Sequence, residues 1–154
     1  MSETYSDRFE NLFSRLTCKV NKAFRYYLSQ ILFERGHDIT AEQMVVLGNL
    51  WHRDGLTQQE ISEIVEQNKA STTRIIDRLE KRYLVIRVTD KKDRRKNMVY
   101  LTALGKERMP EILAVLEKAH ADALAGVELD KLGICREVLS RIITNLSAKR
   151  GAEK

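Results

Sequence analysis

Proline and glycine are scarce in this chain. It has one proline, Pro110, and seven glycines among 154 residues. Because these residues interrupt regular secondary structure more than any others, their scarcity predicts a mainly helical protein. A chain of this length can bury a hydrophobic core without disulfides or structural metal. It fits one domain, or a small domain with appended helices.

Cysteines and long apolar segments are also few. The two cysteines, Cys18 and Cys135, lie far apart within helical patterns, which favours reduced thiols in a reducing compartment over a disulfide framework. No apolar run approaches ~18 residues, the length that a membrane-spanning helix needs. The N-terminal residues are acidic and contain no apolar core, so they do not have the pattern of a secretory signal. We therefore expect a cytoplasmic protein that does not enter membranes.

Catalytic and metal-binding motifs are lacking. The sequence contains no glycine-rich phosphate loop and no nucleophile elbow. Its histidines, His37, His52 and His120, are not spaced as metal ligands, either among themselves or with the cysteines. We therefore expect that the protein is not an enzyme and has no cofactor and no metal site.

Positive charge is concentrated in one segment. Residues 69–96 contain eleven Lys and Arg and four Asp and Glu, a net charge of +7, whereas the whole chain carries +5. A local excess of this kind is typical of a surface that binds nucleic-acid phosphates. A solvated charged hairpin is the alternative, but the polar helix beside the loop favours double-stranded DNA as the partner.

Apolar periodicity predicts six helices and one hairpin. Residues 57–65 and 68–81 form two short helices joined by a tight turn, which is a helix-turn-helix whose second member enters the DNA major groove. A β-hairpin follows, with strands at 84–89 and 97–101 around a cationic loop. Residues 6–34, 40–52, 102–125 and 129–148 are predicted to form the remaining helices.

The predicted fold class is mainly α, with a winged helix-turn-helix core, a β-hairpin wing and long flanking helices. Residues 39–101 form the DNA-binding domain. Residues 1–36 and 102–148 are too apolar to be covered by this core alone, so we expect them to be dimerisation helices of a two-fold homodimer. Residues 149–154 are expected to be a frayed tail.

Three motifs in the central region resemble those of one family. The hairpin carries Asp93-x-Arg95, five further residues, and then Leu101-Thr102-x-x-Gly105. Residues 56–62, LTQQEIS, are similar to the family's supporting helix, and residues 68–74 with 77–81, NKASTTR and DRLEK, to its recognition helix. Together they resemble the multiple-antibiotic-resistance-regulator (MarR) family of bacterial transcription factors. The resemblance is close over residues 40–105 and extends to the flanking helices in pattern only.

The resemblance implies a homodimeric repressor or activator that places one winged helix on each half of a roughly palindromic operator. It implies that Arg95 enters the minor groove and that Asp93 orients it, which agrees with the enhanced negative potential of a narrow groove. The alternative for Asp93 is a simple turn residue, since turns favour Asp. Tyr83 departs from the family, which usually has Gly there, so it either accepts a positive φ or the helix ends differently.

Candidate DNA contacts come from three parts of the chain. The recognition-helix candidates, for base edges or adjacent phosphates, are Ala70, Ser71, Thr73, Arg74 and Arg78. The wing candidates are Lys91, Lys92, Asp93, Arg94, Arg95 and Lys96, whose extra cations add salt-sensitive affinity. The backbone candidates are Thr57, Gln58, Gln59 and Lys69, near two helix starts.

The resemblance also implies a pocket for a small aromatic or lipophilic effector that releases a repressor from DNA. Candidate lining residues are Phe24, Tyr27, Met44, Leu47, Trp51 and His52, although such stripes are usually core. A redox-sensing regulator acting through Cys18, which has basic neighbours, is one alternative. A winged-helix protein-interaction module without specific DNA binding is another.

Overall fold

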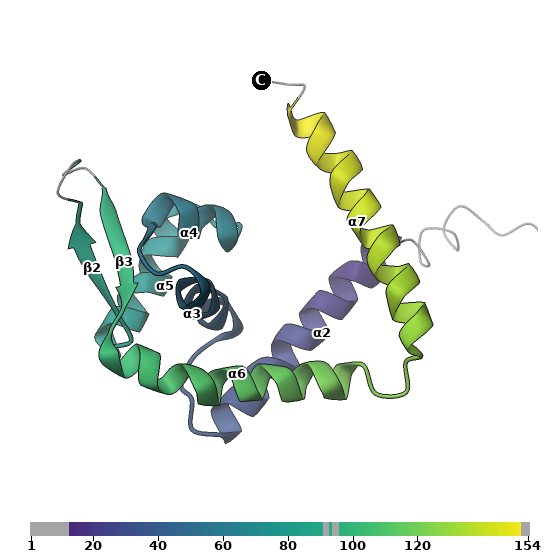
Figure 1. Cartoon of the computed structure of the whole chain (residues 1–154), viewed down its shortest axis with the longest axis horizontal. Coiled ribbons are helices and arrows are strands. Elements are labelled where there is room, and N and C mark those ends of the chain that lie inside the picture. Colours follow the sequence, from purple (N-terminus) through teal and green to yellow (C-terminus); the bar gives the residue numbers. More distant parts are fainter. Residues whose placement is uncertain (1–12, 91–92, 94–95, 152–154) are drawn as a thin grey trace, which may run out of the picture. The chain divides into compact units, whose positions relative to one another are not determined.

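The computed structural model describes residues 13–90, 93 and 96–151. Two compact units divide the chain after His120. The first unit contains most of the elements, and the second contains the end of α6 and all of α7 (Figure 1). The elements are α2 (Phe13–Glu34), α3 (Ala41–His52), β1 (Leu56–Thr57), α4 (Gln58–Ile64), α5 (Lys69–Lys81), β2 (Val85–Thr89), β3 (Asn97–Leu101), α6 (Ala103–Ala123) and α7 (Leu129–Gly151).

The core of the first unit joins the helix-turn-helix to the flanking helices. Helix α5 contributes Ile76 and Leu79, which are fully buried, and α3 contributes Leu47 and Leu50. Helices α2 and α6 complete this core with Leu28, Ile31, Leu32, Met109, Ile112, Val115 and Ala119. The winged helix is therefore packed on the same apolar cluster as the C-terminal half of α2.

The three central helices begin where their capping residues predict. Thr40 and Gln43 form a reciprocal capping box at α3, and Thr57 and Glu60 form one at α4. At α5, the Asn68 side chain accepts a hydrogen bond from the Ser71 backbone N–H. Each contact satisfies an amide that the first helical turn leaves unpaired, so the sequence itself fixes these three helix starts.

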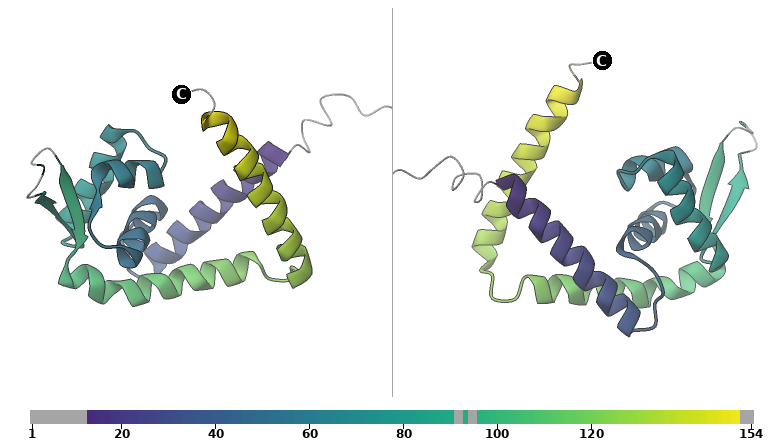
Figure 2. Two further views of the ribbon diagram at one scale, coloured as in Figure 1. Left: turned by 45° about the horizontal axis from the view of Figure 1, so that its top comes forward. Right: turned by 180° about the vertical axis from the view of Figure 1, so that it is seen from behind.

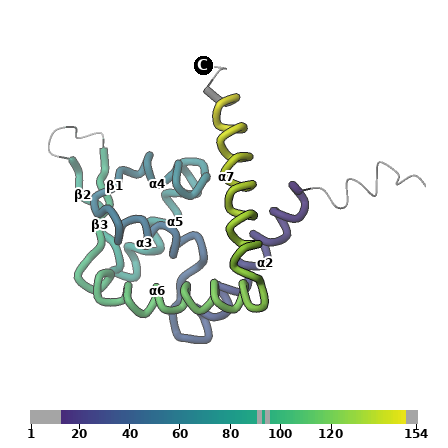
Figure 3. Tube along the Cα trace, turned by 45° about the vertical axis from the view of Figure 1, so that its right-hand side comes forward, coloured from purple at the N-terminus to yellow at the C-terminus, as the bar shows by residue number. Residues whose placement is uncertain are grey.

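The sheet has three antiparallel strands in the order β1-β3-β2. Strands β2 and β3 form the predicted hairpin, in which Arg87 is opposite Val99. The two-residue strand β1, opposite Val99 and Met98, was not predicted; it attaches the start of α4 to the hairpin. The tube in Figure 3 shows β1 beside β3 where the chain enters α4, and the hairpin stands beside the helices of the winged helix in both views of Figure 2.

Both helices of the helix-turn-helix end through a residue in the left-handed region. Tyr83 has φ +57° and Glu66 has φ +51°. The Tyr83 N–H donates to the Glu80 carbonyl and the Leu84 N–H to the Leu79 carbonyl. This pair of bonds is the Schellman motif, which normally uses glycine. Tyr83 therefore accepts the strain, which was one of the two outcomes expected for it.

Gly105 allows α6 to start against the backbone of the hairpin. A Cβ built at this position would lie 2.1 Å from the Leu84 carbonyl oxygen. Thr102 holds the same seam, because its hydroxyl donates to the Tyr83 carbonyl at 2.5 Å and accepts from the Gly105 N–H at 2.9 Å. The Leu-Thr-x-x-Gly pattern thus joins the wing to α6.

The flanking helices differ from their predicted bounds. Helix α7 continues to Gly151 rather than ending at Ala148, three residues beyond its predicted end. Helix α6 runs unbroken through Pro110. Large apolar side chains remain exposed on α2 and α7, among them Leu16, Val20, Ile134, Val138, Ile143 and Leu146. No described helix is long and apolar enough to cross a membrane.

Candidate nucleic-acid interface

Helix α5 presents the predicted recognition residues on its accessible side. Ala70, Arg74 and Arg78 are exposed, whereas Ser71 and Thr73 are half-buried. Thr72, which lies between two of them, is buried, and its hydroxyl is hydrogen-bonded to the Ser62 hydroxyl at 2.9 Å. We call Ala70, Ser71, Thr73, Arg74 and Arg78 the reading face. This alternation lets one helix turn polar groups outward while its other side anchors in the core.

Gln58 connects the supporting helix α4 to the reading face. Its Nε2 donates to the Thr73 hydroxyl at 3.3 Å, and that hydroxyl donates to the Lys69 carbonyl at 2.8 Å. Thr73 is therefore held from two sides. A side chain with a fixed rotamer loses less conformational entropy when it makes a contact with a partner.

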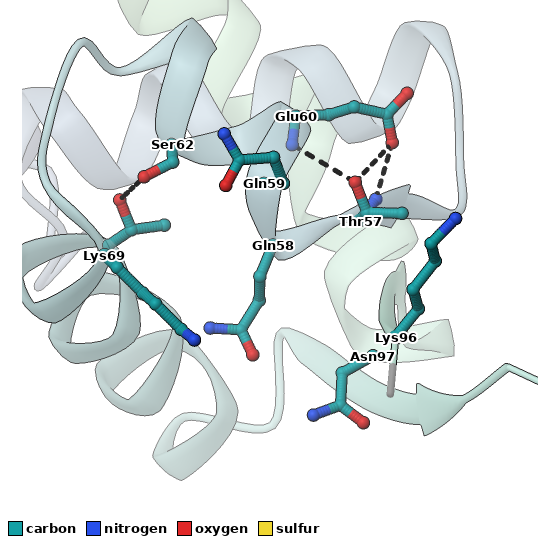
Figure 4. Close-up of a pocket in the computed structure, with 9 residues that line it drawn as sticks. Thr57, Gln58, Gln59, Glu60, Ser62, Lys69, Lys96 and Asn97 are labelled. Atoms are coloured by element: carbon teal, nitrogen blue, oxygen red, sulfur yellow. Dashed lines mark hydrogen bonds between the residues drawn. The ribbon is translucent and has the colours of Figure 1, made fainter. Parts of the chain in front are cut away.

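One cavity brings together the predicted backbone contacts. It has a volume of about 530 Å³ and lies between α4, α5 and the loop end of strand β3 (Figure 4). Thr57, Gln58, Gln59 and Lys69 line it from the two helices, and Lys96 and Asn97 line it from the wing. We call it the α4–wing cavity. These residues come from three separate segments, and the sequence did not show that they share a surface.

Glu60 is an acidic group at the edge of this basic surface. Its carboxylate accepts hydrogen bonds from the Thr57 N–H and hydroxyl, each at 2.8 Å, and it also pairs with Arg53. The Thr57 backbone N–H, followed by the Thr57 hydroxyl, lowers the pKa of Glu60 below its ordinary value. The carboxylate therefore stays ionised as the cap of α4.

The described part of the wing tip is a hydrogen-bonded turn. Asp90 accepts from the Asp93 N–H, and the Lys96 N–H donates to the Asp93 carbonyl, both at 2.9 Å. The Asp93 carboxylate lies 3.9 Å from Lys96 Nζ. Lys91, Lys92, Arg94 and Arg95 lie outside the described residues, so the pairing of Asp93 with Arg95 stays a prediction.

Arg87 is a largely covered charged residue, and the sequence did not indicate its ion pairs with α5. Its side chain is 18% exposed and contacts Asp77 and Glu80 on α5. In the sequence, Arg87 is only one of the eleven Lys and Arg of residues 69–96. The available signal was the alternation of β2, because Arg87 lies two residues after the buried Val85 and so shares its face.

The effector-pocket candidates divide between core and surface. Met44 and Leu47 are buried, Phe24 and Tyr27 are only partly covered, and Trp51 is 42% exposed. His52 is also exposed. Phe24 stacks on His120 with ring centroids 4.9 Å apart. Met44 and Leu47 are thus core residues, and the pocket stays a prediction.

The two cysteines are exposed and free. Cys18 lies on α2 and Cys135 on α7. Among the described residues, no three His, Cys, Asp or Glu side chains are grouped to hold a metal ion.

The chain is similar to known transcriptional regulators by a family model, by sequence and by structure. The family model described as "MarR family" matches residues 39–96. The HTH-type transcriptional regulator TtmR of Methylorubrum extorquens is 30% identical over 99% of this chain and 77% of its own length. The HTH-type transcriptional regulator YdgJ of Bacillus subtilis is 27% identical over 76% of this chain and 71% of its own.

A solved structure shares the fold. A mutant MarR from E. coli complexed with operator DNA superposes with a TM-score of 0.79 and 22% identity, covering 92% of this chain and 99% of that one. This fold and family are those of transcriptional regulators, which are not enzymes. From its capped helix-turn-helix, its hairpin wing and its similarity to TtmR, the chain belongs to the MarR family.

Proposed function

We propose that this transcriptional regulator is a repressor that binds a roughly palindromic operator as a homodimer. The observation that carries the proposal is the joining of two basic surfaces. The reading face exposes Arg74 and Arg78, and the α4–wing cavity adds Lys69 and Lys96 beside it. Together these two surfaces extend from the helix proposed for the major groove to the hairpin. A DNA duplex, which offers a groove and a phosphate backbone side by side, fits this arrangement better than a flat protein surface does.

The proposed complex makes contacts from three parts of the chain. Ser71, Thr73, Arg74 and Arg78 reach base edges or adjacent phosphates, and Ala70 packs on a thymine methyl. Thr57, Gln58, Gln59 and Lys69 bind the backbone. In the wing, Arg95 enters the minor groove with Asp93 orienting it, and Lys91, Lys92, Arg94 and Lys96 contribute phosphate attraction.

A homodimer supplies the cover that the flanking helices lack. Val20 on α2 is 67% exposed, and Ile134 and Ile143 on α7 are 63% and 65% exposed. Apolar stripes of this extent on long helices are typical of an interface between copies of a chain. We propose that residues 1–36 and 102–148 form it, and that each copy places residues 39–101 on one half-site.

Release by a small aromatic or lipophilic effector is the further part of the proposal. Phe24 and Tyr27 on α2, with Trp51 and His52 at the end of α3, are only partly covered or exposed in the single chain. These side chains have apolar surface left for a ligand near the proposed dimer helices, with Met44 and Leu47 as the buried wall. Titration of the DNA complex with phenolic and aromatic acids tests for release.

Selection of genomic fragments followed by affinity measurements tests the DNA-binding proposal. We expect Arg95→Ala to weaken operator binding by about 10–100-fold at fixed salt, the cost of one groove contact, with helicity unchanged. The matched control is Arg108→Ala on α6, whose exposed partner is Glu111, and it should bind as the wild type does. Sedimentation of the complex should give two chains per operator.

Three results would contradict the proposal. Wild-type affinity of Arg95→Ala would remove the wing assignment. One chain per operator would remove the homodimer. A basic surface that contacts phosphates binds duplex most tightly at low salt. Absence of duplex binding even under that condition would therefore favour a protein-interaction module.

A further inference from the structure

We infer that Arg87 is the positioning residue that fixes the recognition helix at a set angle to the wing. This inference rests on the proposed function, since it concerns how two DNA-contacting elements are held together. The evidence is a set of four hydrogen bonds between one residue of β2 and one face of α5, made in a largely covered place.

The first observation is the geometry of the guanidinium. Arg87 Nη2 lies 2.6 Å from Asp77 Oδ1, and Nη1 lies 2.5 Å from Glu80 Oε2. Nη2 also donates to the Thr73 carbonyl at 3.3 Å. The two arms of one planar fork therefore reach two carboxylates and a backbone oxygen. A lysine ammonium is a single point and cannot span both acids in this way.

The second observation is that Glu80 accepts hydrogen bonds from both the side chain and the backbone of Arg87. One carboxylate oxygen accepts from the side chain, and the other accepts from the Arg87 backbone N–H at 3.2 Å. These two bonds fix both the distance of β2 from α5 and its position along the helix. Because an edge strand has unpaired backbone groups, a side chain from α5 that pairs one of them sets where β2 lies along the helix.

The third observation is where the contacts fall on α5. Thr73, Asp77 and Glu80 follow one another at four and three residues, so they share one side of the helix. This side lies between the buried residues Ile76 and Leu79 and the reading face. Thr73 belongs to both, since its carbonyl meets Arg87 and its side chain faces the interface through Gln58. A shift of β2 would therefore move Thr73, a residue of the reading face.

Charge alone does not account for this arrangement. Asp77 and Glu80 are the two acids of an otherwise cationic helix, and one largely covered cation, Arg87, could simply compensate their charge on a surface that faces phosphates. Such compensation needs only a positive charge nearby, whereas the structure has a fork with four oriented bonds. The two roles make different predictions when the acids and the cation are removed together.

The test uses the full chain and measures the ratio of operator affinity to non-specific duplex affinity. Asp77→Asn, Glu80→Gln and Arg87→Met are combined in one variant, which leaves no uncompensated charge. We expect it to bind non-specific duplex at least as well as the wild type, but to lose about 10–100-fold in the ratio, the scale of one lost base contact. Nitrogen-15 relaxation of the free variant should show hairpin amides moving independently of α5.

A wild-type ratio together with wild-type relaxation in the triple variant would overturn the inference, because only compensation of charge would then remain. Circular dichroism checks its folding. If it does not fold, Arg87→Lys carries the test: it retains the charge without the fork, and we expect about a tenfold loss of the ratio. A wild-type ratio in Arg87→Lys would likewise reject the positioning role. Failure of the wild type to select any duplex refutes the proposed function instead, and relaxation still reports on Arg87.

Discussion

Replacing Tyr83 by glycine should stabilise the protein, although it removes a large side chain. Tyr83 has φ +57° and a side chain that is 75% exposed. The backbone bonds of the turn, from the Tyr83 and Leu84 N–H groups to carbonyls of α5, do not depend on that side chain. The substitution therefore removes strain and little burial.

The expected gain is the difference of two opposing terms. A left-handed conformation costs an L-residue with a Cβ about 1–2 kcal/mol. Glycine gives back about 0.5–1 kcal/mol, because it has more freedom in the unfolded chain. At the middle of both ranges the net change is about 0.75 kcal/mol in favour of Tyr83→Gly. For a chain of this size that is a rise in Tm of roughly 1–4 °C.

Tyr83→Ala is the control that isolates the backbone term. Tyr83→Ala keeps the strain and removes the ring. The difference in the free energy of unfolding between Tyr83→Gly and Tyr83→Ala therefore measures the backbone contribution without the ring. Glu66 offers an independent repeat, since it has φ +51° and ends α4 with the same pair of backbone bonds. Urea unfolding at equal chain concentration gives each free energy, because dimerisation makes stability depend on concentration. If glycine were no more stable than alanine at both positions, the strain argument would be wrong.

Two further substitutions test the local structure. Gly105→Ala should destabilise by about 1–3 kcal/mol or more in urea unfolding, because its Cβ would meet the rigid Leu84 carbonyl at 2.1 Å; Gly48→Ala, with open space around it, should cost nothing. Glu60→Gln should lower stability at neutral pH. Because the folded pKa of Glu60 lies below its ordinary value of 4.5, the advantage of the wild type is full above that value and disappears as pH falls through the folded pKa. Unfolding measured from pH 7 to pH 3 checks this, and a difference independent of pH would reject the capping role.

Short-range patterns of the sequence predicted the helix starts correctly. The cap residues Thr40, Thr57 and Asn68 act within three or four positions of themselves, so their partners can be identified from spacing alone. The hairpin strands were also predicted to within one residue, because alternation and a charged turn are local signals. These elements carry the winged helix, and this explains why the fold class could be predicted.

The parts that were missed depend on residues far apart in the chain or on backbone conformation. Strand β1 exists only because Leu56 meets Val99, and its two residues have no periodicity of their own. Glu66 adopts a positive φ without the glycine that would have indicated one. The extent of α7 was underestimated at its end, where polar residues continue a helix that the apolar stripe no longer marks.

The candidate interface was predicted as a set of residues but not as a surface. Gln58, Lys69 and Lys96 were named from helix starts and charge, and the α4–wing cavity shows that they line one space. Arg87 could not be separated from its neighbouring cations, since its role depends on Asp77 and Glu80, which precede it by ten and seven residues. Charge counting identifies a basic segment, but it does not distinguish a buried structural cation from an exposed one.

The wing is attached to the rest of the winged helix by two different kinds of contact. On one side, Arg87 ties β2 to α5 by ionic hydrogen bonds. At its base, Thr102 and Gly105 hold the chain against Tyr83 and Leu84 by close backbone packing. The first contact weakens when charge is removed and the second when volume is added, so they fail independently. A hairpin held at both places is already oriented before it meets DNA, and the entropy of ordering it is not lost on binding. Under the proposed function, the left-handed turn at Tyr83 is then part of what gives this regulator a wing with a fixed direction.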